Sequence, residues 1–144
     1  MTFGPRQRER EGWNRFSKSI DSKRLLTHRV ENICGNGTPD VVMINGYAAT
    51  IWVENKSLKA WPKRPTTAPL KHSFEPGQLS WAREWKHKRG NCFVLLTVED
   101  KEYYLLDPAW RIEEKTREEL LELASATGRE AIIEYLSELR NKAV

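Results

Sequence analysis

The stretch GTPDVVMINGYAATIWVENK, residues 37–56, sets two acids and a lysine into largely apolar surroundings. Asp40 stands at the start of the apolar run, Glu54 lies near its end, and Lys56 follows two residues later. Two carboxylates that lie close together repel each other unless positive charge sits between them. A hard divalent cation meets that need, because Mg²⁺ prefers oxygen ligands and commonly takes one or two carboxylates. A neighbouring lysine could then orient or deprotonate a water, or neutralise charge at phosphorus.

The pattern around these three residues predicts a β-hairpin. An apolar segment precedes Asn45-Gly46, which is a strong hairpin-turn signal, and a second apolar segment follows it. Because side chains alternate along a strand, Glu54 and Lys56 should share one face, and the hairpin can bring Asp40 beside Glu54. The alternative is that Asp40 only caps a turn, while Glu54 and Lys56 form an exposed charge pattern on the strand.

Hydrophobic periodicity and turn residues predict the remaining elements. We expect helices over residues 12–26, 75–90, 116–126 and 128–142, and strands over 27–32, 40–45, 47–56, 92–99 and 101–108. Pro76 suits the first turn of the second helix, and Gly90 suits its C-terminal cap. Trp81 and Trp85 share one face of that helix and are predicted to lie in the core. The order α-β-β-β-α-β-β-α-α predicts an α/β fold with a mixed central sheet, and residues 1–144 fit one domain.

Charge is unevenly distributed along a chain whose formal net charge is +4 and whose pI is near 9.1. Residues 1–30, which begin with a basic leader (1–11), carry eight Lys/Arg against three acids. The Pro-rich loop 57–75 is also basic, whereas the C-terminal helices, over 116–142, are rich in Glu. This distribution favours a polyanionic partner for the first half of the chain, with a solvated surface as the alternative.

Other features bear on location and cofactors. No apolar run approaches the length of a transmembrane helix, and the N-terminus has no signal-peptide pattern. The two cysteines, Cys34 and Cys92, belong to no CxxC or Cys/His cluster, which argues against a zinc site. Reduced thiols are typical of the cytoplasm. We therefore expect a cytoplasmic protein with no membrane association.

The motif in residues 37–56 resembles the PD-(D/E)xK nuclease superfamily, with Pro39-Asp40 as the PD and Glu54-Asn55-Lys56 as the (D/E)xK. The resemblance covers residues 29–97 best, and it is greatest to small phage and archaeal Holliday-junction-resolvase-like nucleases and to VRR-NUC-like domains. It implies a restriction-endonuclease-like core. In the family the middle residue of E-x-K is usually apolar, so Asn55 is a departure; the family uses the backbone carbonyl at that position as a metal ligand.

The resemblance also implies a cofactor and a set of catalytic residues. Mg²⁺, with Mn²⁺ as a substitute, would be held by Asp40, Glu54 and the carbonyl group of Asn55. Lys56 would position the nucleophile, and Gln78, on the helix that follows the E-x-K strand, would support the water or a phosphate group.

A further acid from upstream is common in the superfamily, and three residues are candidates here. Glu31 lies beside the loop that leads to Asp40 and could reach the metal directly. Glu9 and Glu11 lie about thirty residues before Asp40, in the charged leader. Glu31 is favoured, with Glu11 as its substitute.

The implied reaction is metal-assisted hydrolysis of DNA that leaves 5′-phosphate and 3′-hydroxyl ends. Basic side chains and one aromatic ring near the motif are predicted to contact DNA: Arg29, Lys59, Trp61, Lys63, Arg64 and Lys71. Trp61 could stack against bases or fold back onto the core. The favoured function is a structure-selective endonuclease, namely a Holliday junction resolvase that acts on branched DNA as a homodimer, with part of the C-terminal helix as the dimer face. The alternatives are a nickase or general DNA endonuclease, and a non-catalytic nucleic-acid-binding module of the same fold.

Overall fold

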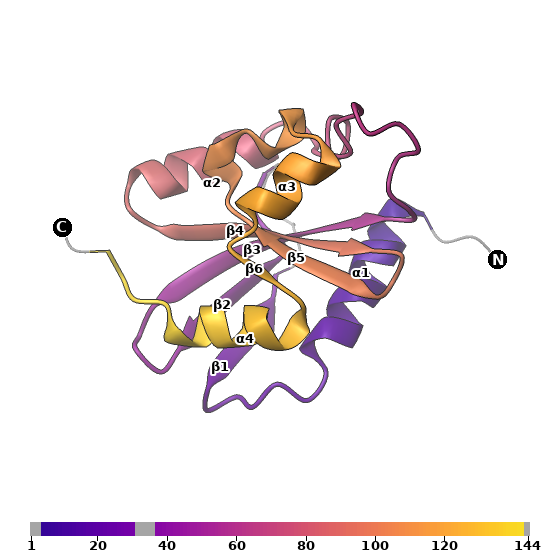
Figure 1. The fold of residues 1–144 in the computed structure, drawn as a ribbon. Helices are drawn as coiled ribbons and strands as arrows, with labels where there is room; N and C mark the ends of the chain where they lie inside the picture. Colours follow the sequence, from indigo (N-terminus) through magenta and orange to yellow (C-terminus); the bar gives the residue numbers. More distant parts are fainter. Residues whose placement is uncertain (1–3, 31–36, 143–144) are drawn as a thin grey trace.

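The computed structural model describes residues 4–30 and 37–142 of the chain. Within these residues the strands form one six-stranded sheet in the order β1-β2-β3-β4-β5-β6 (Figure 1). The elements are α1 (Pro5–Ser17), β1 (Leu25–Arg29), β2 (Val41–Asn45), β3 (Thr50–Leu58), α2 (Gln78–His87), β4 (Asn91–Val98), β5 (Glu102–Leu106), the 3₁₀ helices η1 (Pro108–Trp110) and η2 (Ile112–Glu114), α3 (Arg117–Leu123), β6 (Ala126–Thr127) and α4 (Arg129–Glu138). The predicted α/β class and mixed central sheet flanked by helices are confirmed. The short strand β6 and the two 3₁₀ helices were not predicted.

The strands β3 and β4 pair in parallel, whereas the other neighbouring strands pair antiparallel. A parallel pair requires a crossover connection, which the long loop after β3 and helix α2 provide. All eight residues of β4 are buried, as expected for a strand covered on both faces. The crossover therefore places the start of α2 over the part of β3 that carries the acidic motif.

Helices cover both faces of the sheet and define two cores. On one face, α1 and α4 pack over a cluster that includes Phe16, Ile51 and Ile132. On the other face, a cluster that includes Leu70, Val94 and Leu120 is formed with α3 and the long loop after β3, and α2 contacts β4 on the same face. Figure 1 shows α2 and α3 on one side of the sheet and α4 on the other. We call these the α1/α4 face and the α2/α3 face.

Asn45 fixes the hairpin that carries the motif. Its side-chain oxygen accepts hydrogen bonds from the backbone N–H groups of Tyr47 (3.0 Å) and Ala49 (3.1 Å), which closes the turn. Its side-chain amide donates to the carbonyl groups of Leu136 (2.9 Å) and Leu139 (2.8 Å) at the end of α4. The hairpin is thus held in register and joined to the C-terminal helix at the same residue.

The first helix differs from its prediction. It runs over Pro5–Ser17 and not over 12–26, so most of the supposed basic leader is helical. Pro5 occupies the first turn of the helix, where its missing N–H costs nothing. The chain then turns through Ser19, whose φ is 65°, and enters β1 at Leu25.

The caps of α2 also differ from their prediction. Gly77, with φ of 91°, is the N-terminal cap, so Pro76 lies just outside the helix. Lys88 is the C-terminal cap, and Gly90 lies beyond it. A Cβ atom on Gly90 would lie 2.2 Å from Nε1 of Trp85, so glycine is needed there for close approach of the tryptophan ring.

Two predictions about apolar faces are wrong. Trp85 is not core, because more than a third of it is exposed. The apolar residues of α4 leave no free dimer face: Ile132, Ile133 and Leu136 are buried in the α1/α4 core, and Tyr135 and Leu139 pack against the same cluster. No helix among the described residues is both long enough and apolar enough to cross a membrane.

Candidate active site

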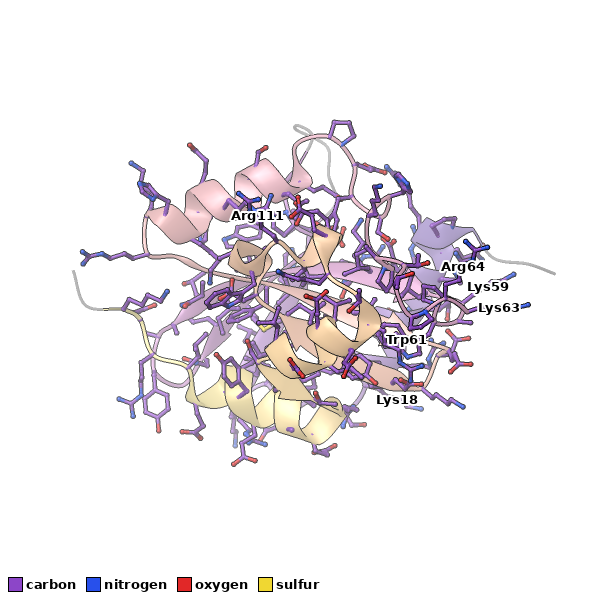
Figure 2. All side chains as sticks on the ribbon, turned by 45° about the horizontal axis from the view of Figure 1, so that its top comes forward. Lys18, Lys59, Trp61, Lys63, Arg64 and Arg111 are labelled. Carbon is purple, nitrogen blue, oxygen red and sulfur yellow. The ribbon has the colours of Figure 1, made fainter. Side chains whose placement is uncertain are left out.

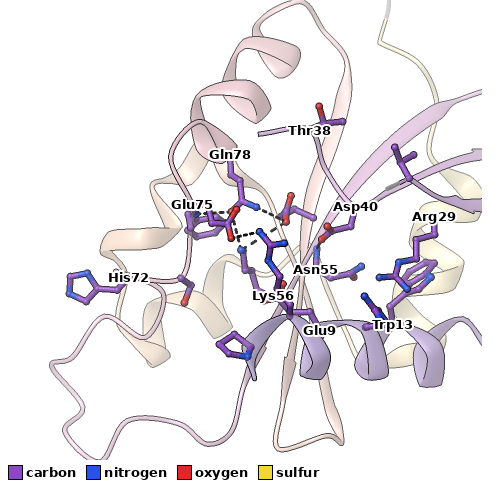
Figure 3. A pocket seen from close by; sticks show the side chains of 17 residues that line it. Glu9, Trp13, Arg29, Thr38, Asp40, Asn55, Lys56, His72, Glu75 and Gln78 are labelled. Carbon is purple, nitrogen blue, oxygen red and sulfur yellow. Dashed lines mark hydrogen bonds and ion pairs between the residues drawn. The ribbon is translucent and has the colours of Figure 1, made fainter. Parts of the chain in front are cut away.

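The acidic motif opens into a pocket with a volume of about 530 Å³. Five parts of the chain form its walls: α1 up to Trp13, Arg29 and Val30 at the end of β1, the residues from Thr38 to Asp40, the centre of β3, and the segment that runs into α2. Figure 3 shows Asp40 beside Asn55, and Lys56, Glu75 and Gln78 gathered close to one another. Residues that lie far apart in the sequence therefore share one pocket.

The hairpin register brings Asp40 to Glu54. Val41 pairs with Val53, so Asp40, one residue earlier, lies across from Glu54. Oδ2 of Asp40 accepts a hydrogen bond of 2.9 Å from the backbone N–H of Asn55. The carbonyl group of Asp40 accepts a second one, of 2.7 Å, from the N–H of Val30 just beyond β1. These bonds hold the Asp40 carboxylate against β3.

Glu54 and Lys56 are buried, each with only 4 % of its surface exposed. An exposed charge pattern on the strand is therefore ruled out. Gln78 connects the two side chains, because its oxygen accepts a hydrogen bond of 2.9 Å from Nζ of Lys56 and its NH₂ group donates one of 3.0 Å to Oε1 of Glu54. Nζ of Lys56 lies 3.9 Å from the same Oε1 atom. The N–H of Glu75 also donates to the Gln78 oxygen, at 2.9 Å, and so fixes the amide orientation.

Crowding of acids changes the titration of this site. Burial, with the neighbouring charge of Asp40 adding to it, raises the pKa of Glu54 to about 10. Burial, with the charge of Asp40 adding to it, also raises the pKa of Glu9 to about 7, although Lys56 acts in the opposite direction. Both shifts mean that the folded, metal-free protein disfavours additional negative charge in this pocket.

The residues present fit a hard divalent cation. Oε2 of Glu54 is buried and has no hydrogen-bond partner among the described residues. This carboxyl oxygen could therefore coordinate a cation. The surrounding donors are the oxygens of Asp40 and the carbonyl group of Asn55, and a set of oxygen donors suits Mg²⁺ or Mn²⁺. Within the described part of the chain no three His, Cys, Asp or Glu side chains already form a cluster that could hold a metal ion. Two carboxylates supplemented by backbone and water remain compatible with Mg²⁺, which keeps several waters.

Of the acids upstream of Asp40, Glu9 is the one that the structure places at the pocket among the described residues. Glu9 lines the pocket, whereas Glu11 does not. Glu31, the favoured residue, lies outside the described residues. Glu9 reaches the pocket because it lies four residues before Trp13 on α1, and Trp13 packs that side of the helix into the core. The sequence signal for a helix that begins early enough to include Glu9 was Pro5 after Gly4.

Basic side chains line the pocket and lie on the loop beside it. Arg29 lines the pocket, together with Arg6 and Arg10, two residues that sequence reasoning did not select. Arg6 also forms an ion pair of 2.9 Å with Glu75, which links α1 to the segment before α2. The predicted loop cations are exposed: Lys59, Lys63, Arg64 and Lys71. Figure 2 shows Lys59, Lys63 and Arg64 together at one end of the molecule.

Trp61 folds back onto the core rather than projecting from the loop. Its ring packs edge-on against Tyr104 with 5.7 Å between centroids, and its Nε1 donates a hydrogen bond of 3.1 Å to Glu102. The guanidinium group of Arg117 lies 4.8 Å from the ring centroid. Trp61 therefore anchors the loop that presents the neighbouring cations.

The fold of this chain has likenesses among solved structures but none among family models or curated proteins. Among solved structures, the chain is similar to Hjc, a Holliday junction resolvase from the archaeal hyperthermophile Archaeoglobus fulgidus. The TM-score is 0.46 at 15 % sequence identity, and the match covers 72 % of this chain and 77 % of that one. A likeness at this level assigns no activity to the chain.

Proposed function

We propose that this chain is a metal-dependent DNA endonuclease that hydrolyses phosphodiester bonds. One observation carries the proposal: Asp40, which is half-buried, lies beside Glu54, which is buried and has an unpartnered carboxyl oxygen, next to Lys56. Burying acids in this way costs free energy that the metal-free protein does not recover. A bound cation would offset that cost, and a phosphodiester is the substrate that suits a cation flanked by basic residues.

Each residue of the pocket has a role in this proposal. Asp40, Glu54 and the carbonyl group of Asn55 would hold the cation, which when bound lowers the pKa of a water and stabilises charge at phosphorus. Lys56 orients the attacking water or neutralises charge on the phosphate. Gln78 keeps Lys56 and Glu54 apart at fixed positions, through its two hydrogen bonds of 2.9 Å and 3.0 Å.

In this proposal, Glu9 is the upstream acid of the site. Its raised pKa places its titration near neutral pH, so it can hold or release a proton at the mouth of the pocket. It comes from α1, which the ion pair between Arg6 and Glu75 ties to the segment before α2. Glu9 replaces Glu11 in the set of site residues.

DNA would be held mainly by its phosphates. Arg29 at the pocket and the exposed loop cations, Lys59, Lys63, Arg64 and Lys71, offer contacts that carry no sequence information. Such contacts give affinity that falls steeply with salt. The expected products are 5′-phosphate and 3′-hydroxyl ends, as the motif resemblance implies.

The favoured substrate is branched DNA, cut as by a Holliday junction resolvase. Two symmetric cuts across a junction require two active sites, so we expect the enzyme to work as a homodimer. A nickase or general DNA endonuclease with the same chemistry is the second candidate. A non-catalytic nucleic-acid-binding module is disfavoured, because binding alone does not require an acid pair with a buried Glu54.

The test is a cleavage assay on a four-way junction, a nicked duplex and a linear duplex, first with Mg²⁺ and then with EDTA. We expect Mg²⁺-dependent cutting of the junction, with paired cuts in opposing strands, and no cutting by a Glu54→Gln variant. Preference for a duplex with cuts in one strand would favour the nickase. Absence of cutting on every substrate with Mg²⁺ or Mn²⁺, or full activity of Glu54→Gln, would overturn the proposal.

A further inference from the structure

The residue between Glu54 and Lys56 is a buried asparagine whose side chain has no hydrogen-bond partner. Asn55 is 7 % exposed, and it lines the pocket. Its backbone N–H donates to Asp40, but its side-chain amide makes no hydrogen bond to any residue within 4–30 or 37–142. Burying an amide group without a hydrogen bond costs free energy. The amide therefore contributes no hydrogen bond to the fold and is available to a ligand of the pocket.

The other buried asparagines that the structure describes do have partners. The side chain of Asn45 makes four hydrogen bonds, two in the hairpin turn and two to the end of α4. Asn91, at the start of β4, is 5 % exposed and donates to the carbonyl group of Thr50 at 3.3 Å. Asn55 is the exception among the three, and it is the one that lines the pocket.

Strand β3 divides the pocket into two halves. Because side chains alternate along a strand, Glu54 and Lys56 point to the α2/α3 face, where Gln78 bonds to both. Asn55 points the other way, like Val53, which lies in the α1/α4 core. Helix α1 contacts β3, and Figure 3 shows Asn55 on the side of the pocket where α1 lies. We call the part of the pocket between Asn55 and α1 the α1 half.

The α1 half offers oxygen acceptors beside the proposed cation. The carbonyl group of Asn55 belongs to the proposed ligand set, and the amide oxygen of the same residue faces α1. Glu9 on α1 supplies carboxyl oxygens to this half. Mg²⁺ keeps several waters when it binds to a protein, and a water on a cation directs its hydrogens outward, where they need acceptors. Arg10 and Arg29 also line the pocket, but guanidinium groups can only donate.

We propose that the side-chain oxygen of Asn55 accepts a hydrogen bond from a water of the cation and so positions that water in the α1 half. The inference rests on the cation site of the proposed function. It goes beyond the motif, in which the middle residue of E-x-K is usually apolar. A DNA phosphate is the less suitable ligand for the amide, because Arg10 and Arg29 offer it charged donors at more exposed positions.

The test compares Asn55→Leu with the wild type, using the full chain, in calorimetric titration with Mg²⁺ without DNA and in urea unfolding with EDTA. Leucine is close to asparagine in size and has no polar group. Asn55→Leu should weaken Mg²⁺ binding about 10-fold or more, as do other changes to residues that hold the ligands of a metal. In EDTA the variant should need at least as much urea to unfold as the wild type, because an unpaired buried amide has been removed.

Two further variants separate this role from a structural one. Asn91→Leu is the matched control, because Asn91 is equally buried, has a partner in the sheet and does not line the pocket. It should lower the urea midpoint and leave Mg²⁺ affinity unchanged. Asn55→Asp keeps an oxygen acceptor at the same position and should bind Mg²⁺ at least as tightly as the wild type.

Equal Mg²⁺ affinity of Asn55→Leu and the wild type would overturn the inference and leave the proposed nuclease intact. A lower urea midpoint of Asn55→Leu in EDTA would also overturn it, because the amide would then belong to the fold. Loss of DNA affinity in EDTA with unchanged Mg²⁺ binding would assign the amide to a phosphate instead. Weakened Mg²⁺ binding in a protein that cuts no DNA would retain the inference and overturn the nuclease, whereas a wild type that binds no Mg²⁺ would overturn both.

Discussion

Two regions on the α2/α3 face of the sheet depart from the usual distribution of side chains in opposite directions. At the pocket, Glu54 and Lys56 are ionisable residues that are buried. On β1 and β2, the paired residues Leu26 and Ile44 form a patch of large apolar side chains that are exposed. Helix α2 starts at the pocket, where Gln78 contacts Glu54.

Each departure costs free energy that the isolated chain does not recover through other contacts. A buried carboxyl group with an unpartnered oxygen loses hydration without a full replacement. An exposed apolar patch leaves the hydrophobic effect unused over that area. A bound cation would offset the cost at the pocket. The two regions therefore differ in the chemistry that would stabilise them, although they share one face of the sheet.

The largest expected effect is at the acid pair. Asp40→Asn and Glu54→Gln should each lower the cleavage rate by about 10³-fold or more, because each removes a cation ligand. DNA binding should stay intact or become tighter, because the basic surface is unchanged and a negative charge is lost. Glu11→Gln is the control, since Glu11 does not line the pocket. Rates are measured under single-turnover conditions, and near-normal cleavage by either variant would remove the pair from the mechanism.

Lys56→Ala should cost about 10²- to 10³-fold in cleavage rate while sparing Mg²⁺ binding. The reason is that Nζ of Lys56 is held by Gln78 at 2.9 Å beside the acid pair without being a cation ligand. Single-turnover cleavage and calorimetric Mg²⁺ titration of the same sample separate the two properties. Loss of Mg²⁺ binding together with activity would make Lys56 a structural residue of the site.

Reversing the charge of the loop should weaken the binding of all DNA substrates to a similar extent. Lys59→Glu, Lys63→Glu and Arg64→Glu together should reduce affinity about 10- to 100-fold for all DNA substrates, and the log–log salt slope should become shallower by about 3. The control carries the same reversals at exposed cations away from the pocket: Lys18, Arg111 and Lys142. Fluorescence anisotropy over a salt series measures both quantities. Equal losses in the two triple variants would show that only net charge matters.

The smallest effect for a single step in conditions is the change of stability of the metal-free protein with each pH unit. Glu54, with a pKa of about 10, and Glu9, with a pKa of about 7, keep their protons in the folded state, whereas the unfolded groups titrate near 4.5. The folded state thus binds more protons above pH 5, and stability should fall as pH rises, by about 1 kcal/mol per pH unit for each group. Glu54 contributes up to about pH 10 and Glu9 only up to about pH 7. Urea unfolding of Glu54→Gln in EDTA should show the shallower dependence; an unchanged pH profile would contradict the shift.

The sequence was sufficient to predict the hairpin but not the upstream acid. Asp40 could be placed across from Glu54 because Asn45-Gly46 and the alternation of side chains fix the register locally. The choice of an acid on α1 depends on where the helix starts, because a shift of one residue rotates each side chain by about 100°. The prediction began that helix at residue 12, and so the side of the helix that Glu9 shares with Trp13 was missed.

The sequence could not predict that Trp85 is exposed, and the reason is a different one. Periodicity shows that Trp81 and Trp85 share a helix face, but it does not show whether that face meets this chain or another one. The same limit applied to α4, part of whose apolar side was assigned to a partner and instead packs against the α1/α4 core. Which faces remain open depends on how the helices are shared between the two sides of the sheet.

The central claim is that Asp40 and Glu54 form a divalent cation site, and calorimetry of Mg²⁺ binding tests it most directly. Titrations of the wild type at pH 7 in two buffers of different ionisation enthalpy give both the affinity and the number of protons released. Because Glu54 holds its proton up to about pH 10 in the metal-free protein, binding should release about one proton or more per Mg²⁺. Glu54→Gln should show neither the binding nor the release. Mg²⁺ binding of equal affinity in Glu54→Gln, or binding to the wild type without proton release, would contradict the account.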